Sequence, residues 1–410
     1  VYARLHWLAA RGKVKECRQL AEHLVESRRE APNVQLYTAL ILSNVSHDGG
    51  GAWRAEEYLE EMKAEGLQPD LACCHALLKV LAVHPDHLLR ADVLEYMQTK
   101  WYELSEDGAH DVVAGLLREG LFEQALDRLD SMQREGRVHP WLLDMAVFIL
   151  CAAGETEAAH EIMQKRHRAG EQLSRVLWLT FLDAGSSQRH HPSTVLTWNS
   201  QVGTGYLNPP SGTCLDVLTT ASQAGDAVLA TDVFTHLSKR GVVFGAFHYQ
   251  LLIECYLRAS PPDLKRAMTI LSIMTEHVMP TSDDTRALFV YLRSDAQLIA
   301  QAFQILRHLY EQNRPVPVSA LNLIIECYVD QGSFTEALKT YKLIHTFSVT
   351  PNATTFNLLL RGYCEPPDEE MATFLFQEML ALNIKPTALT YDRLIQVCLE
   401  ASVRALDGED

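Results

Sequence analysis

The stretch VTPNATTFNLLLRGY, Val349–Tyr363, places a proline and an asparagine just before a run of apolar residues. The apolar residues that recur three and four positions apart, as on one face of an α-helix, are Phe356, Leu359, Leu360 and Tyr363. Proline cannot continue a helix but can precede one, so the stretch predicts the start of a helix. Two other stretches repeat this arrangement, IKPTALTYDRLIQVC (Ile384–Cys398) and LQPDLACCHALLKVL (Leu67–Leu81). Its recurrence near both ends of the chain indicates a structural repeat.

Alanines at a nearly constant spacing measure the repeat. Intervals of 34, 36, 34 and 34 residues separate Ala21, Ala55, Ala91, Ala125 and Ala159. Intervals of 37, 35, 35 and 35 residues separate Ala230, Ala267, Ala302, Ala337 and Ala372. The gap of 71 residues between the two series spans two periods, so the missing mark is expected near Thr194 or Val195. Two packed helices need a small residue where they come closest, so these alanines are predicted to be buried between the helices of a unit.

Each period contains two helical segments joined by a short turn. Second segments such as FEQALDRLDSM (Phe122–Met132) and FTEALKTYKLI (Phe334–Ile344) carry the alanine within an apolar pattern of helical period. Glycines that suit the end of the preceding helix are Gly120, Gly154, Gly225 and Gly332. Units are expected to start near Val34, Leu71, Glu106, Pro140, Arg175, Ser211, Ala246, Ser282, Val318 and Ala353. The sequence therefore predicts an all-α fold, a right-handed superhelical α-solenoid of about ten helix-turn-helix repeats of 34–37 residues.

The same alanine spacing predicts the domain organisation. Residues 1–33 are predicted to form an N-terminal half repeat or cap, and residues 34–174 and 211–387 two series of repeats. Residues 388–410 are expected to form a capping helix and tail. Residues 175–210 lack the alanine, so they are predicted to be a degenerate repeat or joint. Their loops, Gly185–His191 and Gly203–Pro210, are expected to be the most irregular part of the array.

Composition limits the function. The formal net charge of −16 argues against a general nucleic-acid-coating protein, although it leaves room for a local basic groove. No run of 18 or more apolar residues occurs in the 410 residues, so no membrane span is predicted. The nine cysteines form no C-x-x-C pair, and we expect them to be reduced packing residues.

Motifs of catalysis and metal binding are not found. DGGGAW (Asp48–Trp53) lacks the G-K-[ST] ending of a phosphate-binding loop. The histidine pairs of RHHP (Arg189–Pro192) and HPDH (His84–His87) have no carboxylate or cysteine at ligand spacing. We therefore predict a protein that is not an enzyme, with no catalytic residues, no metal ligands and no cofactor.

Several first helices resemble those of the pentatricopeptide repeat family. They read TTFNLLLRGYC (Thr354–Cys364), ALTYDRLIQVC (Ala388–Cys398), SALNLIIECYV (Ser319–Val329) and VQLYTALILSN (Val34–Asn44). The tetratricopeptide pattern W-x2-L-G-x2-Y appears in no unit. The resemblance covers nearly the whole chain and is strongest over residues 318–398. It suggests a P-type array without a C-terminal catalytic domain, and it implies binding of single-stranded RNA in organelles, one base per repeat.

In that family the fifth residue of the first helix and the last residue of the repeat choose the base. The resemblance implies that Thr38 with Asp70 favours guanine, and that Asn322 with Asn352 favours a pyrimidine. Asn357 with Thr387 is a weaker, pyrimidine-like pair. The remaining pairs depart from the pattern: His75 with Ser105, His110 with Pro140, Leu215 with Gly245, Gln250 with Thr281, and Ala287 with Pro317. A second interpretation of the Asn, Asp and Thr residues is that they cap helices, where these residue types are favoured.

Two classes of function remain open. The first is a mitochondrial RNA-binding factor that acts on a transcript or rRNA in stability, processing, splicing or translation. The second is a protein-binding helical scaffold, such as a subunit associated with the mitochondrial ribosome. Cations along the RNA-facing groove would favour the first class, and cations scattered elsewhere would favour the second. The mitochondrial matrix is implied by the resemblance, and a targeting peptide is not visible in a sequence that starts at Val1.

Overall fold

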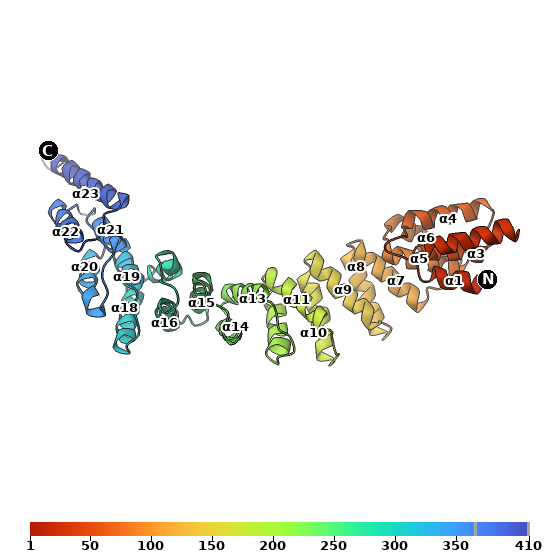
Figure 1. Cartoon of the computed structure of the whole chain (residues 1–410), viewed down its shortest axis with the longest axis horizontal. Coiled ribbons are helices and arrows are strands. Elements are labelled where there is room, and N and C mark those ends of the chain that lie inside the picture. The colour runs from red at the N-terminus through yellow and green to blue at the C-terminus, as the bar shows by residue number, and fades with distance from the viewer. Residues whose placement is uncertain (365–366, 408–410) are drawn as a thin grey trace. The chain divides into compact units, whose positions relative to one another are not determined.

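The computed structural model describes residues 1–364 and 367–407. Within these residues all regular secondary structure is helical, and the one β-bridge, between Cys364 and Pro367, belongs to no strand. The predicted all-α fold is confirmed. The chain divides into two compact units, residues 1–188 and residues from Arg189 onward. Odd-numbered helices are the first helices of the repeats and even-numbered helices are the second (Figure 1).

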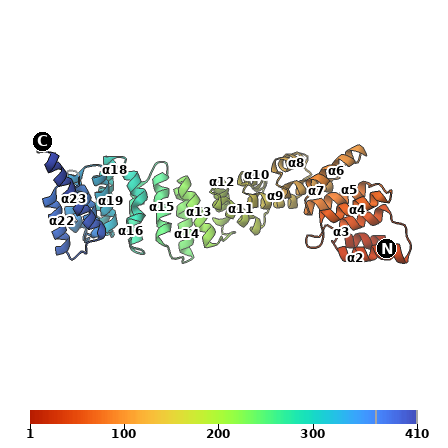
Figure 2. The ribbon, with the colours of Figure 1, turned by 90° about the horizontal axis from the view of Figure 1, so that it is seen from above.

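Unit 1 is a series of helix pairs whose first helices pack side by side (Figure 2). Its first helices are α1 (Tyr2–Ala9), α3 (Val34–Ser43), α5 (Leu71–Val83), α7 (Glu106–Arg118), α9 (Pro140–Ala153) and α11 (Arg175–Ser187). Its second helices are α2 (Val14–Glu22), α4 (Ala52–Ala64), α6 (His87–Thr99), α8 (Phe122–Arg134) and α10 (Thr156–Arg168). A π-helical turn, His23–Ser27, extends α2. Residues 1–33, expected as a half repeat, thus hold two helices.

Unit 2 continues the same alternation. Its second helices are α12 (His191–Thr197), α14 (Ala227–Lys239), α16 (Leu264–Thr275), α18 (Ala296–Glu311), α20 (Phe334–Lys342) and α22 (Glu369–Ala381). Its first helices are α13 (Ser211–Ala224), α15 (Ala246–Arg258), α17 (Arg286–Leu292), α19 (Val318–Asp330), α21 (Ala353–Gly362) and α23 (Ala388–Asp407). Short helical turns lie at Trp198–Val202, Asp283–Thr285 and Ile344–Phe347.

Helix starts agree with the repeat read from the sequence. Nine of the ten expected first helices begin at the predicted residue, and the exception is α17, which a 3₁₀ turn precedes. Side chains that cap these starts accept hydrogen bonds from backbone N–H groups two or three residues inside the helix. The capping residues at such junctions are Asn33, Asp70, Ser105, Ser174 and Asn352. The turn glycines also behave as predicted, since Gly154 and Gly225 end α9 and α13 in the left-handed conformation.

The predicted burial of the evenly spaced alanines is confirmed at nine of the ten positions. Eight of these alanines have at most 1% of their surface exposed and Ala21 has 5%. The missing mark is Thr194, the fourth residue of α12, which is fully buried. The prediction for Ala91 is wrong, because that residue is exposed. The fourth position of α6, which corresponds to the buried alanine of other second helices, is occupied by Arg90. Because alanine is an abundant residue, Ala91 can lie next to that position by chance.

Arg90 brings a charge to a position that elsewhere holds a small residue. Its guanidinium pairs with the Glu119 carboxylate, and both side chains are less than a tenth exposed. Gly115 of α7 faces the Arg90 side chain. A Cβ added at this glycine would lie 3.5 Å from Arg90 Nη1 and 3.3 Å from the Leu81 carbonyl oxygen. Helix α7 therefore accommodates the arginine in two ways: Gly115 leaves room for the side chain, and Glu119, the residue after α7, neutralises its charge.

The segment predicted as a joint is more regular than expected over its first half. Gly185 lies inside α11, so only residues 188–190 separate α11 from α12. The predicted irregular loop over Gly185–His191 is thus wrong, because the chain stays helical to Ser187. The non-helical connection that follows the π-helical turn does begin at Gly203, where irregularity was expected. The proposed domain limits themselves stay predictions.

Candidate nucleic-acid interface

Polar side chains from consecutive repeats meet at the boundary between α19 and α21. Asn322, the fifth residue of α19, donates from Nδ2 to Asn352 Oδ1 at 3.1 Å. The hydroxyl of Thr355, the third residue of α21, donates to Asn322 Oδ1 at 2.7 Å. Asn352 is the residue just before α21, so three positions of the repeat form one cluster. We call such a cluster a repeat-boundary triad.

A second repeat-boundary triad lies one repeat further along. Asn357 Nδ2 donates to Thr387 Oγ1 at 3.2 Å, and the Thr390 hydroxyl donates to Asn357 Oδ1 at 2.7 Å. The two triads have the same positions and the same hydrogen-bond directions at an interval of 35 residues. The resemblance placed Asn322, Asn352, Asn357 and Thr387 in two pairs, and the structure brings each pair together.

The third member of each triad was missed from the sequence. Thr355 and Thr390 are fully buried and hold the asparagine oxygens. Each hydroxyl oxygen also accepts a hydrogen bond from the backbone N–H of the residue just before its own helix. Thr355 accepts from Asn352 at 3.1 Å, and Thr390 accepts from Thr387 at 3.0 Å. The signal that could have found them is a threonine three residues after a capping residue, a variant of the capping box.

The triads leave hydrogen-bond donors for a ligand. Each asparagine uses one of the two Nδ2 hydrogens and its oxygen within the triad. The half-buried Asn352 accepts at Oδ1, and its own Nδ2 group has no partner among the residues described. Amide N–H groups at this place suit a carbonyl acceptor such as those on the edge of a pyrimidine base.

The third predicted pair is not joined. The Thr38 hydroxyl donates within its own helix to the Val34 carbonyl at 2.8 Å. Asp70 is exposed and accepts from the Cys73 backbone N–H at 2.8 Å, as an N-terminal cap of α5. No hydrogen bond between Thr38 and Asp70 occurs in the described structure. The capping interpretation accounts for Asp70, whereas Asn352 both caps α21 and contacts Asn322.

At the boundary of α7 and α9 the pairing differs from the prediction. His110 was paired with Pro140, but α9 begins at Pro140 and the residue before it is His139. The His139 backbone N–H donates to His110 Nε2 at 3.0 Å, and the two rings lie 4.6 Å apart. The Trp141 ring, which is 48% exposed, lies 5.9 Å from His110. The His110 ring itself is buried, whereas the His139 and Trp141 rings beside it are exposed and offer faces on which a base could stack.

A related polar cluster occurs in unit 2 between α15 and the turn before α17. Gln250 Nε2 donates to Asp284 Oδ1 at 2.6 Å. The Thr281 hydroxyl and backbone N–H donate to the other oxygen of the same carboxylate at 2.8 and 2.7 Å. Gln250 and Thr281, which the resemblance paired, are therefore joined through the buried Asp284.

Exposed apolar side chains occupy the second position of several first helices. In unit 1 these are Trp141 and Val176, and in unit 2 they are Phe247 and Leu389, each about half or more exposed. Scattered apolar residues are ordinary on a surface, but these recur at one position of the repeat, three residues before the fifth position. Flat or branched apolar groups at that spacing can support the faces of successive bases.

Charge varies among the first helices, and on four of them it is unfavourable to phosphate. Carboxylates outnumber basic residues on α7, α9, α13 and α19. Burial raises the pKa of the Asp111 carboxyl in α7 to about 6, with Asp107 adding to the shift and Lys79 opposing it. Two cations of unit 2, Arg286 and Arg361, already pair with carboxylates of α19. A continuous basic groove is therefore not formed by these helices.

Two negative findings concern the described residues only. None of their helices is long and apolar enough to cross a membrane. No three histidine, cysteine, aspartate or glutamate side chains among them gather closely enough to hold a metal ion. The seven cysteines from Cys17 to Cys327 are buried and free, and Cys364 is buried, as expected for packing residues.

These features define a helical-repeat protein that presents polar and aromatic side chains at its repeat boundaries. A family model described as "Pentatricopeptide repeat-containing protein" matches residues 211–344. A second, "Pentatricopeptide repeat domain", matches residues 57–101 and 348–401, so that the two cover more than half of the chain. The chain belongs to the pentatricopeptide repeat family.

Curated relatives are from Arabidopsis thaliana. Pentatricopeptide repeat-containing protein At5g10690 is 30% identical over 112 residues, which are 26% of this chain and 19% of that protein. Pentatricopeptide repeat-containing protein At1g26460, mitochondrial, is 21% identical over 436 aligned residues, covering 96% of this chain and 68% of that protein. The chain thus spans about a fifth of the first relative and about two thirds of the second.

Among solved structures, the chain is similar to the pentatricopeptide repeat protein PPR10 from maize. The crystal structure of that protein has 20% sequence identity and a TM-score of 0.40, and the match covers 99% of this chain and 58% of that one. A structure of PPR10 in complex with an 18-nt psaJ RNA element gives 18% identity and a TM-score of 0.31, covering 98% of this chain and 72% of that one.

Proposed function

We propose that this protein binds single-stranded RNA along its first helices, with bases addressed at the repeat boundaries. The observation that carries the proposal is the pair of repeat-boundary triads around Asn322 and Asn357. Two consecutive repeats place an asparagine amide and a threonine hydroxyl at the same positions with the same hydrogen-bond directions, and the residue before the helix is Asn352 in one triad and Thr387 in the other; one extended nucleotide per repeat can follow this interval. Capping alone would not require Asn322 or Asn357, because neither residue lies at a helix end.

The charge distribution determines the expected mode of binding. Among the first-helix side chains that the structure describes few cations are unpaired, so we expect phosphate contacts to contribute little and the affinity to depend on hydrogen bonds and stacking. In unit 1 the exposed rings of His139 and Trp141, next to the buried His110, provide stacking, and in unit 2 the two triads provide donors. The favoured ligand is a pyrimidine-rich single strand with exposed bases.

We further propose that the protein acts on a mitochondrial transcript, in its stability, processing, splicing or translation. One relative, At1g26460, is named mitochondrial, and the family resemblance pointed to the same compartment. An rRNA is the second RNA partner consistent with this setting. Fluorescent tagging of the full-length protein in its own cells would test the compartment, and a cytosolic signal would reject it.

Binding is tested by titrating oligonucleotides of about ten nucleotides, one per repeat, at fixed salt. Wild type should prefer oligouridine or oligocytidine to oligoadenosine. Asn322→Ala with Asn357→Ala should remove that preference, with a cost of about 1 kcal/mol for each hydrogen-bonding side chain. A matched control is Gln301→Ala with Gln304→Ala, two exposed amides on the second helix α18.

The outcomes separate the parts of the proposal. Absence of RNA affinity in the wild type would reject RNA binding. Affinity with unchanged base preference in the double variant would reject the triads as the reading groups. Because the triads join two repeats, circular dichroism must show that the variant is folded, and Asn322→Ser with Asn357→Ser keeps a hydroxyl if the alanine variant unfolds.

A protein-binding scaffold is the second candidate, and the acidic first helices favour it. Carboxylates of α7, α9, α13 and α19 would repel phosphate but attract a basic protein surface. A scaffold associated with the mitochondrial ribosome would fit this chemistry. Co-sedimentation with salt-washed mitochondrial ribosomes, without affinity for isolated RNA strands, would support this alternative over the first.

A further inference from the structure

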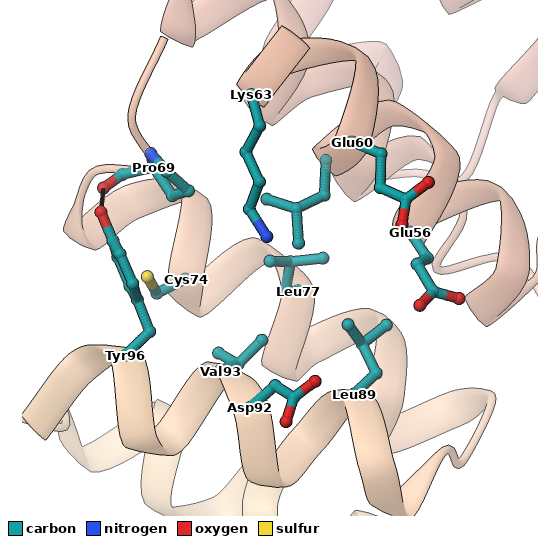
Figure 3. A pocket seen from close by; sticks show the side chains of 11 residues that line it. Glu56, Glu60, Lys63, Pro69, Cys74, Leu77, Leu89, Asp92, Val93 and Tyr96 are labelled. Carbon is teal, nitrogen blue, oxygen red and sulfur yellow. Dashed lines mark hydrogen bonds between the residues drawn. The ribbon is translucent and has the colours of Figure 1, made fainter. Parts of the chain in front are cut away.

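A separate groove lies on the second helices of unit 1, whereas the repeat-boundary triads belong to unit 2. It runs between α4 and α6 above α5, and it contains a cavity of about 140 Å³. Its floor is apolar and is made by Leu59, Leu77, Leu89, Val93 and the Cys74 thiol. At one end the Tyr96 hydroxyl donates to the Pro69 carbonyl at 3.1 Å, which fixes the wall (Figure 3).

Carboxylates stand at the rim of this apolar floor. Glu56 and Glu60 come from α4, and Asp92 comes from α6 (Figure 3). All three are exposed, and none has an ion-pair or hydrogen-bond partner among the residues described. A ligand that fits must therefore bury apolar groups between the two helices while presenting positive charge to both of them.

The chain's own Lys63 indicates which charge the groove attracts. Figure 3 shows that its side chain extends from α4 into the space between the two helices, over Leu77. Lys63 forms no ion pair with the three carboxylates, so the rim keeps an excess of negative charge around it. An incoming cation would compete with this ammonium group for the same space.

We propose that the groove between α4 and α6 is a docking site for an arginine side chain carried by a helical segment of a partner protein. The methylene stem of arginine can lie on the apolar floor while its planar guanidinium reaches carboxylates on both helices. RNA is not the occupant, because the rim would repel its phosphates. A protein segment is favoured over a free guanidinium compound, because Leu88, four residues before Asp92 and so on the same side of α6, is 66% exposed and offers further apolar contact.

The test uses the full chain with methyl-labelled leucine and valine, followed by NMR. The probe is an alanine-based helical peptide with one central arginine and a leucine one turn away on each side. The same peptide with citrulline, which keeps the shape and removes the charge, is the ligand control. We expect the arginine peptide to shift the methyl signals of Leu59, Leu77, Leu89 and Val93, with an affinity at least about tenfold higher than the citrulline peptide.

Substitutions in the groove have opposite expected signs. Lys63→Ala removes the competing cation and should tighten binding of the arginine peptide about threefold. Glu60→Gln with Asp92→Asn should weaken it about three- to tenfold. The matched control is Glu57→Gln with Glu61→Gln, which makes the same change of charge, but at residues that line the neighbouring groove between α2 and α4. This control should change the affinity less than twofold, because salt screens the more distant charges.

The proposal is overturned by any of five results. The first is the absence of methyl shifts in the groove, and the second is equal binding of the citrulline peptide. The third is equal weakening by the groove and control variants. The fourth concerns the source of the arginine: N-acetylarginine amide that binds as tightly as the peptide would reject a protein segment as the occupant. Displacement of the arginine peptide by oligouridine would likewise show that the groove belongs to the RNA surface.

Discussion

The buried ion pair between Arg90 and Glu119 allows a quantitative test of how the repeat is packed. Both side chains are less than a tenth exposed, so solvent screens their interaction weakly. In Glu119→Ala the guanidinium of Arg90 stays at the closest approach of α6 to its neighbours without a carboxylate. Removing one partner of a buried pair costs about 3–5 kcal/mol, a large part of the about 5–15 kcal/mol that stabilises a typical domain.

The double variant Arg90→Ala with Glu119→Ala should recover most of this loss. It installs the alanine that the fourth position already holds in α4, α8 and α10, and it leaves no buried charge. A residual cost of about 1–2 kcal/mol is expected, because the space of the arginine side chain is only partly refilled. The single and double variants together form a thermodynamic cycle for the pair.

Hydrogen exchange of the full chain is the appropriate assay, because repeat arrays open locally and depart from two-state unfolding. Amides of α5, α6 and α7 should exchange about 100-fold faster or more in Glu119→Ala, which corresponds to about 3 kcal/mol. Amides of α19 and α21, in unit 2, serve as the internal reference. A single variant within about 1 kcal/mol of wild type, or a double variant no more stable than the single one, would refute the reasoning.

Three further predictions concern packing, pH and salt. Ala337→Leu should overpack a residue with no exposed surface and cost about 1–3 kcal/mol, measured as faster hydrogen exchange of α19 and α20; unchanged exchange would contradict close packing at this alanine. Asp111→Asn should stabilise the protein above pH 6 by about 1–2 kcal/mol. Because the pKa of Asp111 is raised, the native state binds more protons than the unfolded chain between pH 3.8 and about 6, so wild-type stability falls relative to the variant as the pH rises through that window. A difference in stability between variant and wild type that does not change with pH would refute the raised pKa. RNA affinity should depend weakly on salt, with a slope of log K against log[salt] shallower than about −2, whereas a slope near −5 would contradict a binding mode with few phosphate contacts.

Most of the fold could be predicted from the sequence, because a repeat provides the same signal many times. Junctions such as those before Leu71 and Ala353 combine proline, a capping residue and an apolar run, and each signal acts locally. The predictions are wrong where a single repeat departs from the pattern that the other repeats share. Ala91 was selected by its spacing, but only the packing of α6 distinguishes it from Arg90.

The candidate site was less predictable, because its contacts cross from one repeat to the next. The resemblance pairs the fifth residue of a first helix with the last residue of the repeat. The hydrogen bonds between these two residues depend on a third side chain that bridges the pair. Thr355 bridges Asn322 and Asn352, and no rule based on two positions includes it. The pairing of His110 failed for a different reason: a proline can occupy the first turn of a helix, so the residue before α9 is His139 and not Pro140.

The repeat-boundary triads also limit how strongly RNA can be read. Asn322 is only 6% exposed, and its oxygen and one N–H are already bonded to Thr355 and Asn352. A base that bonds to the remaining donors meets side chains held in place, so little conformational entropy is lost on binding. A base that needs the asparagine oxygen must instead break the bond from Thr355, which offsets what it gains. Bases with carbonyl acceptors should therefore bind at the triads without disturbing them. Thr355→Val tests this distinction directly: it frees the oxygen of Asn322, and it should raise the affinity for bases that donate a hydrogen bond relative to those that accept one.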